Sequence, residues 1–276
     1  MRVFISFLAI LVISISCDDS GLHGEEDSSL RHSKRIKLLR TIAEDSLSKD
    51  EAHFQYDGDI LAGVKYVSYY RQDLNSEFGY GETRHEYKYS NGLLTEILNA
   101  EYPESPEASI TYNQGQLSKI SWYLTGRHST DSYKYNSAGQ IDSLIGYWSY
   151  PASISETSWT KVKWNADNAE KYYRKTLQYI LSNGTSNVYY DTVSYEYGDK
   201  LNPFNDPLYL GYIMYFRNEA ILPYLSKNIL TKAIGTYAIR TLEYEFDQDN
   251  FPIRITETYY SDWSTPRVYT KEIEYE

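Results

Sequence analysis

Residues 133–141 read YKYNSAGQI, and this short pattern recurs in looser forms along almost the whole chain. Tyr133 and Tyr135 are two positions apart, so in a β-strand their side chains point to the same face. Asn136 and Gly139 tolerate a positive φ at low cost and therefore favour a turn. Ile141 then restarts an apolar pattern. The stretch predicts a β-hairpin in which two strands flank a Gly-containing turn.

The looser copies share two apolar or aromatic residues at positions i and i+2, followed by turn residues rich in Asn, Asp and Gly. They begin at Phe54, Tyr87, Ile110, Val162, Tyr195 and Tyr244, and the chain ends on Ile273 and Tyr275. Consecutive hairpins with short connections form an up-and-down meander. We therefore predict an all-β fold, an antiparallel up-and-down meander of about ten to fourteen strands. We expect it to be curled or barrel-like, because closure removes unpaired edges.

Two segments depart from the hairpin pattern. Residues 34–43 carry apolar side chains that fit one face of a strand or one face of a helix, and the strand is favoured because strands follow. Residues 202–235 contain three prolines and a compact apolar run at 208–216. We predict an irregular insertion there with one short helix and a packing role. Residues 236–276 return to two or three strands.

The N-terminus predicts export and lipid anchoring. Residues 1–16 read as a lipoprotein signal peptide, with Arg2 before an apolar core that is too short to span a bilayer. The sequence SISC at 14–17 resembles a lipobox, in which Cys17 is lipidated; the alternative is an ordinary signal peptide with a chance Cys. Residues 17–34 are polar and acidic and predict a flexible tether, either an export signal or a plain linker. Residues 35–276 then form a single domain.

Composition excludes several functions. The formal net charge of −11 argues against a nucleic-acid partner, and a single Cys excludes an internal disulfide framework. The five His residues show no metal-ligand spacing, and no catalytic or phosphate-binding motif is present. We expect no metal, no cofactor and no enzymatic activity. Strand carboxylates such as Glu86, Glu196, Glu243 and Glu245 fit outward positions opposite Lys or Arg; a carboxylate-based glycoside hydrolase is the least favoured alternative.

Aromatic side chains crowd one region of the sequence and form the candidate ligand-binding set. Its members are Trp122, Tyr123, Tyr147, Trp148, Tyr150 and Trp159. If they converge on one surface, their rings suit stacking against a sugar or a peptide. The alternative is that they cover the sheet, and in so Tyr-rich a repeat that alternative is favoured.

The repeat resembles the YD repeat of Rhs-type proteins, most closely at residues 133–141 and 87–93. It departs from that family because its anchors are unevenly spaced, its Asp is usually Asn or absent, and no toxin-like cargo follows. It is more similar to lipid-anchored YD-like proteins of Bacteroidota, which carry a barrel-like β-meander domain of unknown function. The sequences NPF at 202–204 and SKN at 226–228 also resemble those proteins. The resemblance covers residues 35–276 and implies architecture rather than activity.

Together these features predict a cell-envelope lipoprotein that acts as a binding or structural module. We expect it in the outer membrane, held by its N-terminal lipid anchor, with exposure at the cell surface left open. Candidate partners are a glycan, a peptide or an envelope protein. One alternative is glycan or peptide capture for nutrient uptake through the aromatic set; the other is a scaffold within a surface complex.

Overall fold

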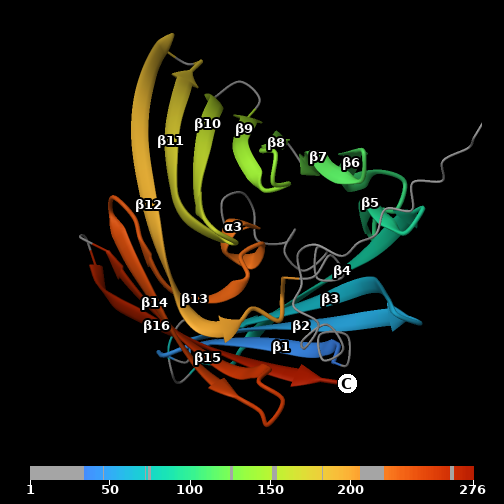
Figure 1. The fold of residues 1–276 in the computed structure, drawn as a ribbon. Helices are drawn as coiled ribbons and strands as arrows, with labels where there is room; N and C mark the ends of the chain where they lie inside the picture. The colour runs from blue at the N-terminus through green and yellow to red at the C-terminus, as the bar shows by residue number, and fades with distance from the viewer. Residues whose placement is uncertain are drawn as a thin grey trace, which may run out of the picture. The chain divides into compact units, whose positions relative to one another are not determined.

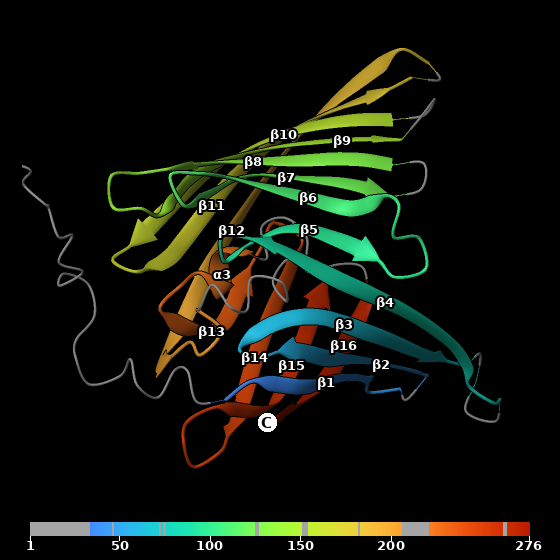
Figure 2. The same cartoon turned by 90° about the vertical axis from the view of Figure 1, so that its right-hand side faces the viewer.

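The computed structural model describes residues 34–276 apart from 46, 72, 74–75, 125–126, 151–153, 182, 206–220 and 262–263. Residues Arg35–Glu276 form one compact unit. Its sixteen strands make a closed antiparallel barrel in which every strand pairs with its neighbours in sequence and β1 pairs with β16 (Figures 1 and 2). The predicted all-β antiparallel meander is confirmed, and the sheet closes. The predicted signal peptide, Cys17 and tether lie outside the described residues.

The strands follow one another around the barrel in chain order. They are β1 (Ile36–Ala43), β2 (Ser48–Asp57), β3 (Ile60–Tyr70), β4 (Gly79–Ser90), β5 (Leu93–Asn99), β6 (Pro106–Asn113), β7 (Gln116–Leu124), β8 (Arg127–Tyr135), β9 (Ile141–Tyr150), β10 (Ile154–Asn165), β11 (Asn168–Ile180), β12 (Thr185–Leu201), β13 (Asn228–Ile234), β14 (Ala238–Phe246), β15 (Pro252–Ser261) and β16 (Ser264–Tyr275). The predicted ten to fourteen strands were too few. The long interval between Tyr197 and Phe246 holds strand β13, which lacks the aromatic pair used to recognise the other hairpins. The ambiguous first segment is a strand, as favoured.

The turns adopt the backbone conformations that the sequence predicts. Gly139 has φ 77°, and Asn91 and Gly92 have φ 51° and 76°, the positive pair that a type I′ hairpin turn requires. The Asn136 side chain completes its turn, because its Oδ1 accepts hydrogen bonds from the backbone N–H of Ala138 at 2.9 Å and of Gln140 at 3.0 Å. The predicted hairpin turns are therefore confirmed at these positions.

One aromatic of the repeat unit, the second of the pair except at Tyr244, has a structural role that explains its recurrence. It sits at the end of one strand, points into the barrel, and donates a hydrogen bond to a backbone carbonyl near the start of the preceding strand. The pairs are Tyr56 to Ile36, Tyr89 to Leu61, Tyr112 to Leu94, Trp164 to Ile141, Tyr197 to Ala169, Tyr244 to Leu230 and Tyr275 to Pro252, at 2.6–3.0 Å. Each ring thus fills the core and satisfies a carbonyl at the same time.

The predicted insertion is narrower than residues 202–235. Residues 228–234 are strand β13 of the barrel sheet, so the excursion ends before Asn228. Its described part includes the short helix α3 (Ile221–Tyr224), whose Leu222 is fully buried in the hydrophobic core that lines the barrel (Figure 1). Asn202 ties the ends of the excursion together, since its Nδ2 donates to the carbonyl of Ser226 at 3.1 Å. The predicted apolar run at 208–216 lies outside the described residues.

The outer wall of β1–β4 carries paired charges. Arg40 contacts Glu51 at 3.0 Å and Glu272 at 3.1 Å across three neighbouring strands, and Lys65 contacts Glu82 at 2.9 Å. Burial alone would raise the pKa of Glu51, but hydrogen bonds from cationic neighbours outweigh it and lower this pKa to about 2. The predicted outward Glu196 likewise pairs with Lys232 on the next strand. Among the described residues, no helix is both long and apolar enough to cross a bilayer.

Candidate functional site

The six candidate aromatics do not gather on one surface. Trp122 is 8% exposed and packs in the hydrophobic core, and Trp148 lines a hollow inside the barrel. Tyr123, Tyr147 and Trp159 are 42–48% exposed on the outside. Adjacent residues of a strand point to opposite faces, so 122 and 123, like 147 and 148, are necessarily separated. Tyr150 ends strand β9 opposite Ile154, and its side chain lies outside the described part of the chain.

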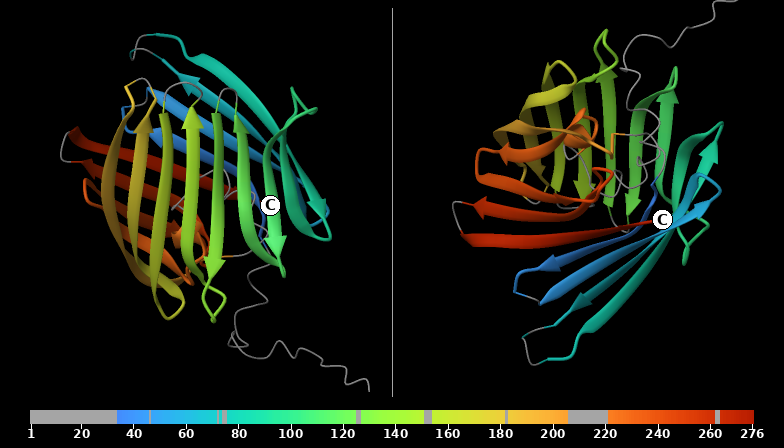
Figure 3. Two further views of the ribbon diagram at one scale, coloured as in Figure 1. Left: turned by 90° about the horizontal axis from the view of Figure 1, so that it is seen from above. Right: turned by 60° about the horizontal axis from the view of Figure 1, so that its bottom comes forward.

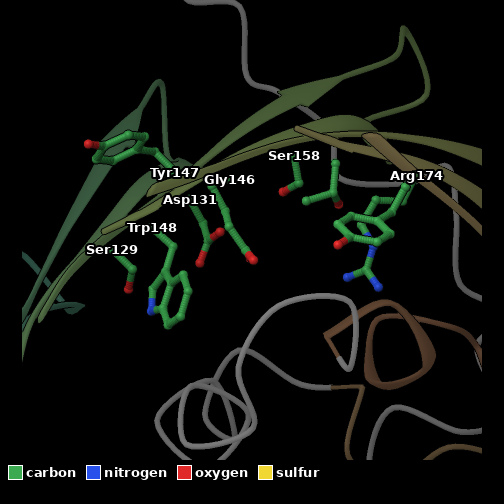
Figure 4. A pocket seen from close by; sticks show the side chains of 10 residues that line it. Ser129, Asp131, Gly146, Tyr147, Trp148, Ser158 and Arg174 are labelled. Carbon is green, nitrogen blue, oxygen red and sulfur yellow. The ribbon is translucent and has the colours of Figure 1, made fainter. Parts of the chain in front are cut away.

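The feature that the structure does assemble is a polar hollow on the inner face of β8–β12. Its volume is about 480 Å³, within the usual range for small-molecule sites. The lining residues are Ser129, Asp131, Gly146, Tyr147, Trp148, Glu156, Ser158, Arg174, Thr176 and Tyr189. In Figure 4 the labelled side chains of Trp148, Asp131 and Arg174 project from one side of the sheet, whereas Tyr147 projects from the other.

The centre of the hollow is one cross-strand row. Asp131 of β8 lies opposite Gly146 of β9, which lies opposite Ser158 of β10, and Thr176 of β11 continues the row. A Cβ on Gly146 would lie 2.6 Å from Ser158 Oγ and 3.1 Å from Asp131 Oδ1. Gly146 therefore leaves the space in which a carboxylate and a hydroxyl approach each other. The Asp131 residue is 8% exposed, so its carboxylate is held in a fixed, largely desolvated position.

The next row lies closer to the β9–β10 turn, which follows Tyr150. This row adds an aromatic face and a second carboxylate. Trp148 lies opposite Ser129 on one side and Glu156 on the other. Glu156 accepts a hydrogen bond from Gln178 Nε2 at 2.5 Å, which orients the carboxylate. An indole plane thus stands beside a carboxylate and a hydroxyl on three adjacent strands.

On the other side of the central row, the next row contains a cation and a carboxylate that neutralise each other. Arg174 of β11 contacts Asp191 of β12 at 3.0 Å, and its guanidinium lies 5.9 Å from the ring of Tyr172. Beyond it the inner face becomes apolar, with Val162 and Tyr172 paired across β10 and β11 and both about 5% exposed. The apolar core of the barrel therefore begins beside the polar hollow.

The chemistry of this hollow is that of a binding site with mixed donors and acceptors. Asp131 and Glu156 accept hydrogen bonds, the Ser and Thr hydroxyls both donate and accept, and Trp148 offers a flat apolar surface. Among the described residues no cluster of three or more His, Cys, Asp or Glu side chains is arranged to hold a metal ion.

Sequence reasoning found Trp148 but missed the polar residues around it. A signal for them was present: the inward parity of β8 is fixed by Tyr133 and Tyr135, so 131 and 129 must also point inward. An inward Asp and an inward Ser that follow two inward aromatics mark the point where the core ends. What the sequence lacked was the register that places the neighbouring strands beside them.

No protein-family model matches the sequence, and no curated protein sequence matches it. Among solved structures, the barrel is similar to a porin-like protein from Bacteroides uniformis, with a TM-score of 0.56 and 10% identity over 87% of this chain and 98% of that chain. A porin-like protein from Bacteroides vulgatus aligns with a TM-score of 0.42 and 10% identity, again over 87% of this chain and 98% of that chain. The first similarity supports the closed-barrel fold.

Proposed function

We propose that this protein is a lipid-anchored binding module of the bacterial cell envelope, and that its ligand is a small, hydroxyl-rich molecule held in the polar hollow of the barrel. The observation that carries the proposal is the hollow itself, which Trp148, Asp131 and Glu156 line together. The envelope location rests on the predicted signal peptide and on Cys17. The fold similarity to a porin-like barrel is compatible with that location.

The side chains favour a neutral saccharide over other small ligands. A pyranose ring presents C–H groups on its faces, which suit the Trp148 indole, and hydroxyls on its rim, which suit carboxylate acceptors. An anionic ligand would meet Asp131 and Glu156, and the cation of the hollow, Arg174, is already paired with Asp191. This deepens the expected glycan-capture alternative and moves it from the whole aromatic set to Trp148.

We propose a binding role rather than an enzymatic one, because the sequence carries no recognised catalytic motif. Capture of a nutrient glycan at the outer membrane is the process that such a site fits best.

The test is calorimetric titration of neutral mono- and oligosaccharides into the unlipidated chain, residues 18–276, which contain every strand of the closed sheet. We expect Trp148→Ala to abolish binding and Trp159→Ala, on the outer side of the same sheet, to leave it unchanged. Binding of amino sugars but not neutral sugars would mean a cationic ligand. No binding by the parent to any saccharide, or equal loss in both variants, would refute the assignment.

The anchor is tested separately. Membrane fractions should contain the native chain with acyl mass on Cys17, and a Cys17→Ala chain should leave the membrane pellet. A native chain without acyl mass would remove the lipoprotein part of the proposal and leave the binding site untouched.

A further inference from the structure

The outer side of β9–β12 differs from the rest of the described wall. Figure 3 shows these strands side by side. Their outward side chains form an outer aromatic face, whose large members are each 36–68% exposed: Ile145, Tyr147, Trp159, Tyr173, Leu177, Tyr179, Val188 and Tyr190. The strand registers place them in neighbouring rows, because Ile145 lies opposite Trp159 and Tyr147 lies in the next outward row. They therefore form one continuous patch rather than scattered contacts.

The charge on this face is opposite to that of the chain. Four outward rows cross β9–β12: Ser149–Ser155–Tyr179–Ser186, Tyr147–Thr157–Leu177–Val188, Ile145–Trp159–Lys175–Tyr190 and Ser143–Lys161–Tyr173–Thr192. They contain two lysines and no carboxylate, although the chain has a formal net charge of −11. Lys161, at the edge of the face, forms an ion pair with Asp142, which lies just beyond these rows. Lys175 lies 6.0 Å from the Trp159 ring, so its ammonium is held at the centre of the patch.

We propose that the outer aromatic face rests on a bilayer surface that carries anionic headgroups. Tyr and Trp are the side chains that prefer the boundary between headgroups and acyl chains, and lysines near that boundary are attracted by anionic lipid. The interleaved Ser and Thr residues keep the face at the interface, since a wall inside the hydrocarbon needs a continuous apolar band.

A second copy of this chain is a poorer occupant. In a twofold dimer the same patch faces itself, so Lys175 would be buried against a face whose four outward rows contain no carboxylate. The wall of β1–β4 offers no comparable face, because Arg40, Glu51, Lys65 and Glu82 are engaged in ion pairs there. The inference concerns the outside of the barrel and does not depend on the ligand of the hollow.

Vesicle flotation of the unlipidated chain, residues 18–276, tests the inference. We expect flotation with phosphatidylcholine vesicles that contain about 30 mol% phosphatidylglycerol, and its loss at roughly 0.5 M salt or without the anionic lipid. Lys175→Glu should lower partitioning about thirty-fold, because it replaces an attraction by a repulsion. Trp159→Ser should lower partitioning and remove quenching of Trp fluorescence by brominated lipid.

The matched controls lie away from the face. Lys37→Glu on β1 makes the same charge change, and Tyr102→Ser removes an aromatic that is 69% exposed in the β5–β6 loop. Both should float like the parent, as should Trp148→Ala, which affects only the hollow. Three results would overturn the inference: no flotation of the parent, equal losses for Lys175→Glu and Lys37→Glu, or concentration-dependent dimers that Trp159→Ser abolishes.

Discussion

The hydroxyl of Tyr197 gives the sharpest test of how the barrel is held together. It donates to the carbonyl of Ala169 at 2.8 Å and lies 2.9 Å from the Oγ of Ser226. Ser226 is fully buried, accepts from the N–H of Ala169 at 3.0 Å and donates to the carbonyl of Leu222 at 3.0 Å. One phenol group therefore joins β12, the start of β11 and the turn after α3. Burial raises the pKa of Tyr197, so the hydroxyl stays protonated over the whole neutral range.

Tyr197→Phe keeps the ring and removes the hydrogen bond to Ala169, together with the polar contact to Ser226. Because a buried carbonyl then loses this partner, the free energy of unfolding should fall by about 1–3 kcal/mol. For a domain of this size, at about 2–4 °C for each kcal/mol, that corresponds to a drop in Tm of roughly 2–12 °C. Thermal and urea unfolding followed by circular dichroism on residues 18–276 would measure it.

Two further variants make the comparison internal. Tyr244 makes one such bond as well, to the carbonyl of Leu230 at 2.6 Å, so Tyr244→Phe should show a comparable loss. Tyr190 is 68% exposed on the outer face, and Tyr190→Phe should change stability by less than about 0.5 kcal/mol. If Tyr197→Phe has the same Tm as Tyr190→Phe, the buried hydroxyls do not stabilise the barrel. The recurrence of Tyr at these positions would then need another explanation.

Three other results are expected. Gly139→Val should destabilise the barrel by about 1–3 kcal/mol, because φ 77° is strained for a β-branched residue; unchanged urea unfolding would contradict the turn assignment. Burial raises the pKa of Tyr89 and of Tyr112 to about 12, above the unfolded value near 10. Their contribution to the free energy of unfolding is therefore complete below pH 10 and lost between pH 10 and 12. Tyr89→Phe should reduce this alkaline loss of stability in unfolding measurements at different pH. The pKa of Glu51 is about 2 in the folded protein and 4.5 in the unfolded chain. Its contribution to the free energy of unfolding is therefore present above pH 4.5 and lost as the pH falls toward 2. Glu51→Gln should lose less stability in acid than the parent, and the same dependence of stability on pH in both would argue against the ion pairs.

The sequence was sufficient to predict the hairpins because their signals are local. An aromatic pair, an Asn or Asp and a Gly within nine residues determine a strand end, a turn and the face that points inward. The strand count failed where this local signal is missing, between Tyr197 and Phe246. Closure of the sheet was expected because an open sheet leaves the N–H and C=O groups of its edge strands unpaired. The pairing that closes it, Ile36 with Tyr275, joins residues that no local sequence pattern connects.

The site was harder to predict, because it is a property of register rather than of sequence windows. Trp148, Glu156 and Arg174 belong to three strands, and their shared hollow exists only after each hairpin is aligned with the next. Grouping aromatics by closeness in sequence was misleading for the same reason. Neighbours such as Tyr147 and Trp148 lie on opposite sides of the wall, with one in the hollow and the other on the outer aromatic face.

The pairing of β1 with β16 has a consequence for how such a chain can change over evolution. The N–H of Glu276 donates to the carbonyl of Arg35 at 2.9 Å, so the two ends of the barrel meet as the strands of a hairpin do, without a linker. Within the sheet, every hairpin pairs with its two neighbours around the ring. Duplication of one hairpin would therefore add two strands and widen the barrel, while the pairing between the first and last strands keeps its geometry. Barrels of different diameter, which fit different ligands, are accessible by copying whole hairpins.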